Sequence, residues 1–141
     1  MPEAPRLEYL FTMTATLAAA QAIRGGPVGT RMIFPVTGGT FDGPRLAGTI
    51  VANSGGDWVQ VRADGSFRLD VRITLRTKDG ADIYMAYAGI GVSDAGKTTI
   101  RTAPLFETGD ERYAWLNRIQ AVASGASNAG TVSYDVFELA I

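Results

Sequence analysis

DGSFRLDVRITLRTKDGADIYMAY, residues 64–87, is the stretch that decides the fold of this chain. An Asp-Gly pair stands on each side of the run from Phe67 to Arg76, and Asp-Gly is a preferred dipeptide of two-residue hairpin turns. Within that run apolar and polar side chains alternate without interruption, which is the pattern of a half-buried β-strand. The stretch therefore predicts three antiparallel strands with one apolar and one charged face.

The rest of the chain continues in the same style, with strand-length segments separated by glycine-rich turns. We expect further strands at about 7–17, 30–36, 46–52, 57–62, 98–106, 116–124 and 131–139. The segment 108–115 predicts one helical turn capped by Asp110. Many short strands without a long helix indicate a single all-β domain over residues 1–141. The expected fold is an antiparallel β-barrel of about eight to ten strands, calycin-like or allene-oxide-cyclase-like, because closure removes exposed strand edges.

The charge and hydropathy of the chain exclude several partners. A net charge of −1 lacks the basic excess that nucleic-acid binding requires. No run of 18 or more apolar residues is present, so we expect no membrane partner. Residues 10–20 resemble the apolar core of a secretion signal, but Glu3 and Glu8 precede it where such signals carry positive charge. We therefore interpret this segment as a first strand and expect a cytoplasmic protein.

The chain contains neither cysteine nor histidine. This excludes thiolate catalysis, a Ser-His-Asp arrangement and the usual zinc sites. Proton transfer would have to use Asp, Glu, Tyr, Lys or water. No phosphate-binding glycine loop or calcium-binding spacing is present, so we expect no metal and no other cofactor.

Two-residue turns would fix the register of the three central strands. With Asp64-Gly65 and Asp79-Gly80 as the turns, Arg72 lies opposite both Asp57 and Tyr87, and Asp70 lies diagonal to this row. The register thus predicts a carboxylate, a guanidinium and a phenol within side-chain reach on the polar face.

Two interpretations of this predicted row remain open. If the polar face points into the barrel, Asp57 or Asp70 is the candidate base, Arg72 stabilises developing negative charge, and Tyr87 is the proton donor. If the polar face points to solvent, the same charges are surface pairs that contribute about 0–1 kcal/mol each.

A second group of residues is a candidate for ligand binding. Glu107, Tyr113, Trp115 and Asn117 cluster around the predicted helical turn, where side chains can line a barrel mouth. The alternative for this cluster is a capping turn with an aromatic plug. The remaining candidates for contact with a ligand are Trp58, Tyr84 and Arg101.

Four segments resemble the domain-of-unknown-function 3237 family. They are TGGTFDGPRLAG (37–48), GGDW (55–58), DVR (70–72) leading into LRT (75–77), and RTAPLFETGDERYAWLN (101–117). The resemblance implies a small single-domain β-barrel and carries no established general activity. The polar positions that match the family pattern are Asp57, Asp70, Arg72, Arg101, Glu107 and Asn117.

Three functions follow from these observations as hypotheses. The first is a cyclase, isomerase or lyase that acts on a small organic ligand in the barrel lumen. The second is a non-catalytic carrier of an apolar small molecule. The third is a structural or oligomeric module, and the large apolar side chains on both strand faces predict a homo-oligomer, a dimer or higher.

Overall fold

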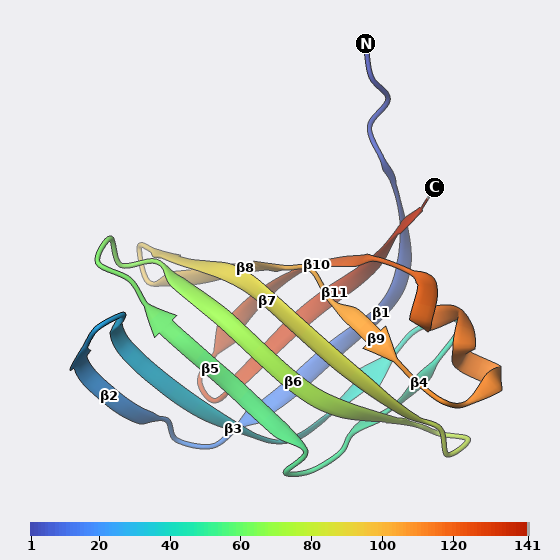
Figure 1. The fold of residues 1–141 in the computed structure, drawn as a ribbon, viewed down its shortest axis with the longest axis horizontal. Coiled ribbons are helices and arrows are strands. Elements are labelled where there is room, and N and C mark those ends of the chain that lie inside the picture. Colours follow the sequence, from blue (N-terminus) through green and yellow to red (C-terminus); the bar gives the residue numbers. More distant parts are fainter. Residues whose placement is uncertain (141) are drawn as a thin grey trace.

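Eleven antiparallel strands form one sheet that closes on itself in the computed structural model, which describes residues 1–140 (Figure 1). The first six strands are β1 (Arg6–Leu17), β2 (Gln21–Gly26), β3 (Gly29–Asp42), β4 (Ala47–Ile50), β5 (Gly55–Val61) and β6 (Phe67–Thr77). The other five are β7 (Asp82–Asp94), β8 (Lys97–Thr102), β9 (Leu105–Glu107), β10 (Ala121–Asn128) and β11 (Thr131–Ala140). A short 3₁₀ helix, η1 (Glu111–Arg118), lies between β9 and β10.

Eight of these strands make the ring. The pairings run β1–β3–β5–β6–β7–β8–β10–β11 and return from β11 to β1. The other three strands each follow or precede a ring strand in the chain after a short non-strand segment and pair with the same neighbour. Thus β2 pairs with β3 as β1 does, β4 pairs with β3 as β5 does, and β9 pairs with β7 as β8 does. The β-barrel prediction is confirmed. The eight strands of the ring lie within the expected eight to ten, and the interruptions bring the total number of strands in the sheet to eleven.

The two central hairpin turns differ from the prediction in length. Each loop has three residues, with Gly65 and Gly80 in the left-handed region at φ 85° and 90°. The Arg62 N–H donates to the Ser66 carbonyl at 2.9 Å, and the Thr77 N–H donates to the Ala81 carbonyl at 2.9 Å. Asp-Gly suits the three-residue loop as well, because its last residue is left-handed and favours glycine. The predicted two-residue turns, and the register built on them, are therefore wrong.

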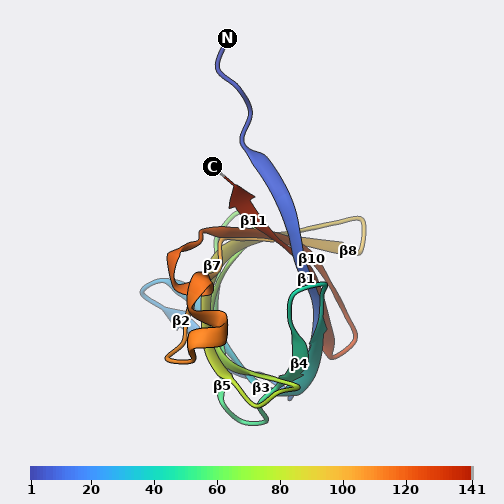
Figure 2. The ribbon, with the colours of Figure 1, turned by 90° about the vertical axis from the view of Figure 1, so that its right-hand side faces the viewer.

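The apolar face of the strands points inward. At the end of the barrel where η1 lies, the interior is packed, with Phe11 against Phe41 and Phe106 at ring-centre distances of 5.4 and 6.0 Å. Leu116 of η1 is fully buried in the same core. As predicted, Asp110 caps this helix by accepting a hydrogen bond from a backbone N–H of its first turn. Figure 2 shows the ring of strands from this end, with the helix beside it.

The charged face of β6 points to solvent. Arg72 lies 3.6 Å from Asp70, and Arg76 lies 2.7 Å from Asp82, with side chains about half exposed in each pair. Such surface pairs contribute little to stability. Within residues 1–140, no helix is long and apolar enough to cross a membrane.

Candidate functional site

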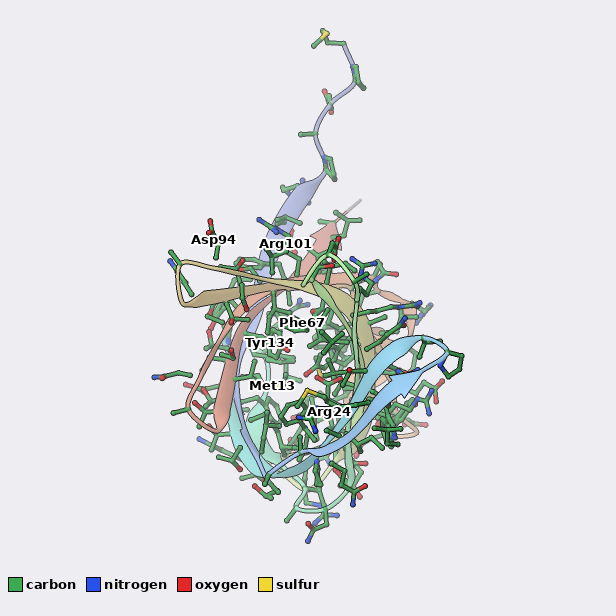
Figure 3. The ribbon with its side chains drawn as sticks, turned by 90° about the vertical axis from the view of Figure 1, so that its left-hand side faces the viewer. Met13, Arg24, Phe67, Asp94, Arg101 and Tyr134 are labelled. Carbon is green, nitrogen blue, oxygen red and sulfur yellow. The ribbon has the colours of Figure 1, made fainter. Side chains whose placement is uncertain are left out.

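The barrel encloses a cavity at the end away from η1, with a volume of about 490 Å³. This volume lies in the range of sites that bind small molecules. Its wall is mainly apolar and includes Met32, Phe34, Val59, Val61, Leu69 and Ile100, while polar side chains such as Thr98, Ser127, Asn128 and Thr131 also contribute. Figure 3 looks into this end and shows Phe67 and Tyr134 inside the ring of strands.

Asp57 is the only charged side chain that lines this cavity in the described part of the chain. It is 8% exposed, and no Lys or Arg of residues 1–140 forms an ion pair with it. Its carboxylate accepts the backbone N–H of Asp70 at 3.1 Å. Burial raises the pKa of Asp57 to about 6; the hydrogen bond from Asp70 lowers it and the negative charge of Asp70 raises it further. Asp57 can therefore gain or lose a proton near neutral pH.

Two tyrosines share the lumen with this carboxyl group. Tyr87 of β7 and Tyr134 of β11 pack edge to face with ring centres 5.4 Å apart. Burial raises the pKa of both phenols, and the nearby Asp57 carboxylate contributes to both rises. Both phenols are thus protonated at neutral pH and can donate a hydrogen bond. The Tyr87 hydroxyl lies close enough to Tyr134 to lower the pKa of Tyr134 and raise its own. The buried Tyr134 oxygen nevertheless has no hydrogen bond of regular geometry within residues 1–140.

Two glycines hold the aromatic rings of the cavity against its wall. Gly125 lies opposite Tyr134 in the ladder between β10 and β11, and Gly91 lies opposite Phe67 between β6 and β7. A Cβ atom on Gly125 would lie 2.4 Å from Cδ1 of Tyr134, and one on Gly91 would lie 2.0 Å from Cζ of Phe67. The rings therefore occupy the space that a side chain on either glycine would need.

The predicted row of Asp57, Arg72 and Tyr87 does not form. Because each hairpin loop has one residue more than predicted, Val71 lies opposite both Asp57 and Tyr87. A one-residue slip moves a side chain to the other face of a sheet. Asp57 and Tyr87 therefore point into the barrel and remain in one row, joined by Val71.

Arg72 and Asp70 lie on the outer face of β6, where their side chains are 57% and 48% exposed. The predicted lumen roles of these two residues required the polar face to point inward, so that part of the prediction is wrong. The backbone of Asp70 still serves the site, because its N–H is the hydrogen-bond donor to Asp57.

The predicted ligand-binding residues lie outside the lumen. Tyr84 pairs with Glu107 across β7 and β9, and both border a shallow outer hollow with Asn117. Asn117 accepts the backbone N–H of Thr108 and donates to its carbonyl, so it closes the loop before η1. Contact of these residues with a ligand stays a prediction.

The other three predicted ligand-binding residues also face outward or lie at the barrel end. The half-buried Trp58 ring lies 5.8 Å from the Arg72 guanidinium carbon. The centre of the Trp115 ring lies 4.1 Å from the Arg45 guanidinium carbon. Arg101 is exposed and pairs with residues of β7 and β10. No group of three or more acidic side chains within residues 1–140 is arranged to hold a metal ion.

Tyr134 is the functional candidate that the sequence does not single out. Alternation along residues 131–140 places Val132, Tyr134 and Val136 on one face, which marks all three as core positions. What distinguishes Tyr134 is its free hydroxyl in a cavity. No local sequence signal reports that property.

The fold and the cavity define a small antiparallel β-barrel with a buried carboxyl group in its lumen. The chain belongs to the family described as protein of unknown function DUF3237, whose model matches residues 5–139. A UPF0311 protein from Rhodopseudomonas palustris strain TIE-1 is 30% identical, with 96% of this chain and 98% of that protein covered.

Two further similarities bear on fold and chemistry. The crystal structure of a β-barrel-like protein from Acinetobacter baumannii superposes with a TM-score of 0.90 at 32% identity, covering 98% of each chain. The hydroalkoxylation enzyme phnH of Penicillium herquei is 31% identical, with 85% of this chain and 74% of that protein covered. The crystal structure of an enzyme from Penicillium herquei matches with a TM-score of 0.74 at 26% identity, covering 99% of this chain and 97% of that one.

Proposed function

We propose that this protein is an acid–base enzyme of the cyclase, isomerase or lyase kind, and that its reaction takes place in the barrel lumen. The observation that carries this proposal is a buried carboxyl group without a cationic partner, set in an apolar cavity beside a phenol with a free hydroxyl. A carboxyl group in such surroundings is a common general base, because a pKa of about 6 leaves it mostly ionised at neutral pH and still able to hold a proton.

The Penicillium herquei relative supports one reaction class within this proposal. Hydroalkoxylation adds an alcohol O–H across a carbon–carbon double bond. When both groups belong to one molecule, the product is a cyclic ether of unchanged mass. We infer that this chain catalyses an addition of this type, or the reverse elimination.

The residues of the lumen have distinct roles in such an addition. The Asp57 carboxylate takes the hydroxyl proton while the substrate oxygen bonds to the carbon of a double bond that a carbonyl activates. The π electrons move toward the carbonyl oxygen, to which the Tyr134 hydroxyl donates a hydrogen bond. The proton on Asp57 then passes to the neighbouring carbon, so the carboxylate is restored and every atom is retained. Tyr87 is the second candidate donor.

The test uses 2′-hydroxychalcone and a panel of larger hydroxy-enones, whose ring closure changes their absorbance but not their mass. We expect wild-type protein to accelerate closure of at least one member, and Asp57→Asn to lose about 100-fold or more of that rate. Asp94→Asn, which removes a carboxyl group from the exposed end of β7, is the matched control and keeps the rate. Equal rates for wild type and Asp57→Asn across the panel would contradict the proposal.

A carrier function would use the same cavity, and its apolar wall favours that second candidate. The two functions differ in what Asp57→Asn does. A carrier shows no turnover of any compound that it binds, in the wild type or in the variant, whereas the enzyme loses its turnover in the variant. Calorimetry with the panel compounds, run beside the rate assay, distinguishes the two.

A further inference from the structure

We infer that the lumen selects an uncharged molecule and binds it by one hydroxyl group, as an alcohol, phenol or enol, held between Asp57 and Tyr134. This inference names the substrate class of the proposed enzyme and so rests on the proposed function. The inference follows from which charged and hydrogen-bonding groups line the cavity and which are absent from its described wall.

An anionic ligand would find no cationic partner in this cavity. No Arg or Lys of residues 1–140 lines it, and the arginines of β6 alternate onto the outer face. A carboxylate or phosphate would instead meet the Asp57 carboxylate in an apolar enclosure. Burying a second negative charge there without a counter-ion is strongly unfavourable.

An ammonium ligand would neutralise the charge of Asp57, but it cannot accept a hydrogen bond from Tyr134. An ammonium group offers three donors and no acceptor, so it leaves the Tyr134 hydroxyl proton without a partner. It must also shed its hydration in the apolar cavity, and that cost often exceeds the gain from a buried ion pair.

Asp57 and Tyr134 both line the cavity, and they are close enough that the Asp57 carboxylate contributes to the raised pKa of Tyr134. A hydroxyl group matches the hydrogen-bonding capacity of both. Its proton donates to the Asp57 carboxylate, which accepts one protein hydrogen bond from the Asp70 N–H and retains further lone pairs. Its oxygen accepts from Tyr134, whose own oxygen is otherwise without a partner. In the proposed addition Asp57 takes this hydroxyl proton, and the Tyr134 hydroxyl turns its hydrogen bond from the hydroxyl oxygen to the carbonyl oxygen.

The test compares four probes that share one ring system and differ in one group. They are 1-naphthalenemethanol, protonated 1-naphthalenemethylamine, 1-naphthoate and 1-methylnaphthalene, each titrated into the full chain by calorimetry at pH 8. We expect the alcohol to bind about tenfold or more tightly than each of the other three, because it alone satisfies both buried hydrogen-bonding groups. In Asp57→Asn and Tyr134→Phe this advantage over 1-methylnaphthalene shrinks, while the affinity for 1-methylnaphthalene stays the same.

Every other outcome overturns the inference. Tighter binding of the amine would assign the lumen to cations, and tighter binding of naphthoate would assign it to anions. Equal affinity for the alcohol and 1-methylnaphthalene, or undetectable binding of the alcohol, would show that no hydroxyl is recognised. Because these are binding measurements, a preference for the alcohol without turnover of the hydroxy-enones rejects the enzyme and keeps the binding class.

Discussion

Replacing Asp57 by Asn should make the folded protein more stable at neutral pH, even though the change removes the candidate base. Burial raises the pKa of this carboxyl group from 3.8 to about 6, so its charged form is disfavoured in the folded state. At 1.36 kcal/mol for each tenfold change in proton affinity, the difference corresponds to about 3 kcal/mol.

The sign of the effect follows from proton binding. Between pH 4 and about 6 the folded protein keeps a proton on Asp57 that the unfolded chain releases. The free energy of unfolding of the wild type therefore falls as the pH rises through this range. Asn has nearly the same shape, keeps an oxygen that can accept the Asp70 N–H, and does not titrate. The variant should match the wild type near pH 4 and exceed it by up to about 3 kcal/mol above pH 7.

The assay is urea unfolding of both proteins at intervals from pH 4 to pH 8, with Asp94→Asn, at the exposed end of β7, as the control for loss of one negative charge. The structural reasoning is refuted if Asp57→Asn is less stable than the wild type at pH 8, or if the difference between them does not change with pH. If Asp57→Asn gains stability and loses turnover, Asp57 lowers the stability of the folded protein in return for activity, as is common for active-site residues.

Further predictions concern the rate, the cavity wall and the outer surface. The kcat/KM for a reactive hydroxy-enone should rise with pH through about 6, since the base form of Asp57 is the carboxylate; a flat profile would argue against this role. Gly125→Ala displaces the Tyr134 ring, so it should lower stability by about 1–3 kcal/mol in urea unfolding and reduce turnover, while Gly109→Ala, with open space around it, should do neither. Arg72→Ala on the outer face should change stability by about 0.5 kcal/mol or less and leave kcat/KM unchanged. Large apolar side chains remain exposed on β7 and β9, namely Tyr84, Ile90, Val92 and Leu105, so light scattering at micromolar concentration should give the mass of a dimer or larger. A monomeric mass would contradict this prediction.

The fold could be predicted from the sequence because its signals are local. Alternation along residues 67–77 marks a strand whichever register it adopts, and the glycine turns separate it from its neighbours. The Asp110 cap of η1 could be placed on the same basis. The interrupted strands were harder, because β2 differs from a loop only by its pairing with β3.

The candidate site could be predicted only in part, because it depends on the length of two turns. Asp-Gly is compatible with two- and three-residue loops, and one residue decides whether Asp57 faces solvent or the lumen. Both loops were longer than predicted, so Asp57 and Tyr87 changed face together and stayed in one row through Val71. The free hydroxyl of Tyr134 depends on residues from distant strands, which no local pattern reports.

A crystal structure of the protein with 1-naphthalenemethanol would show directly whether Asp57 and Tyr134 bind a hydroxyl group. We expect the naphthalene ring inside the barrel, with the hydroxyl oxygen within about 2.5–3.0 Å of both the Asp57 carboxylate and the Tyr134 hydroxyl. A probe bound in the outer hollow between Tyr84 and Asn117, or one in the lumen whose hydroxyl contacts neither residue, would contradict it.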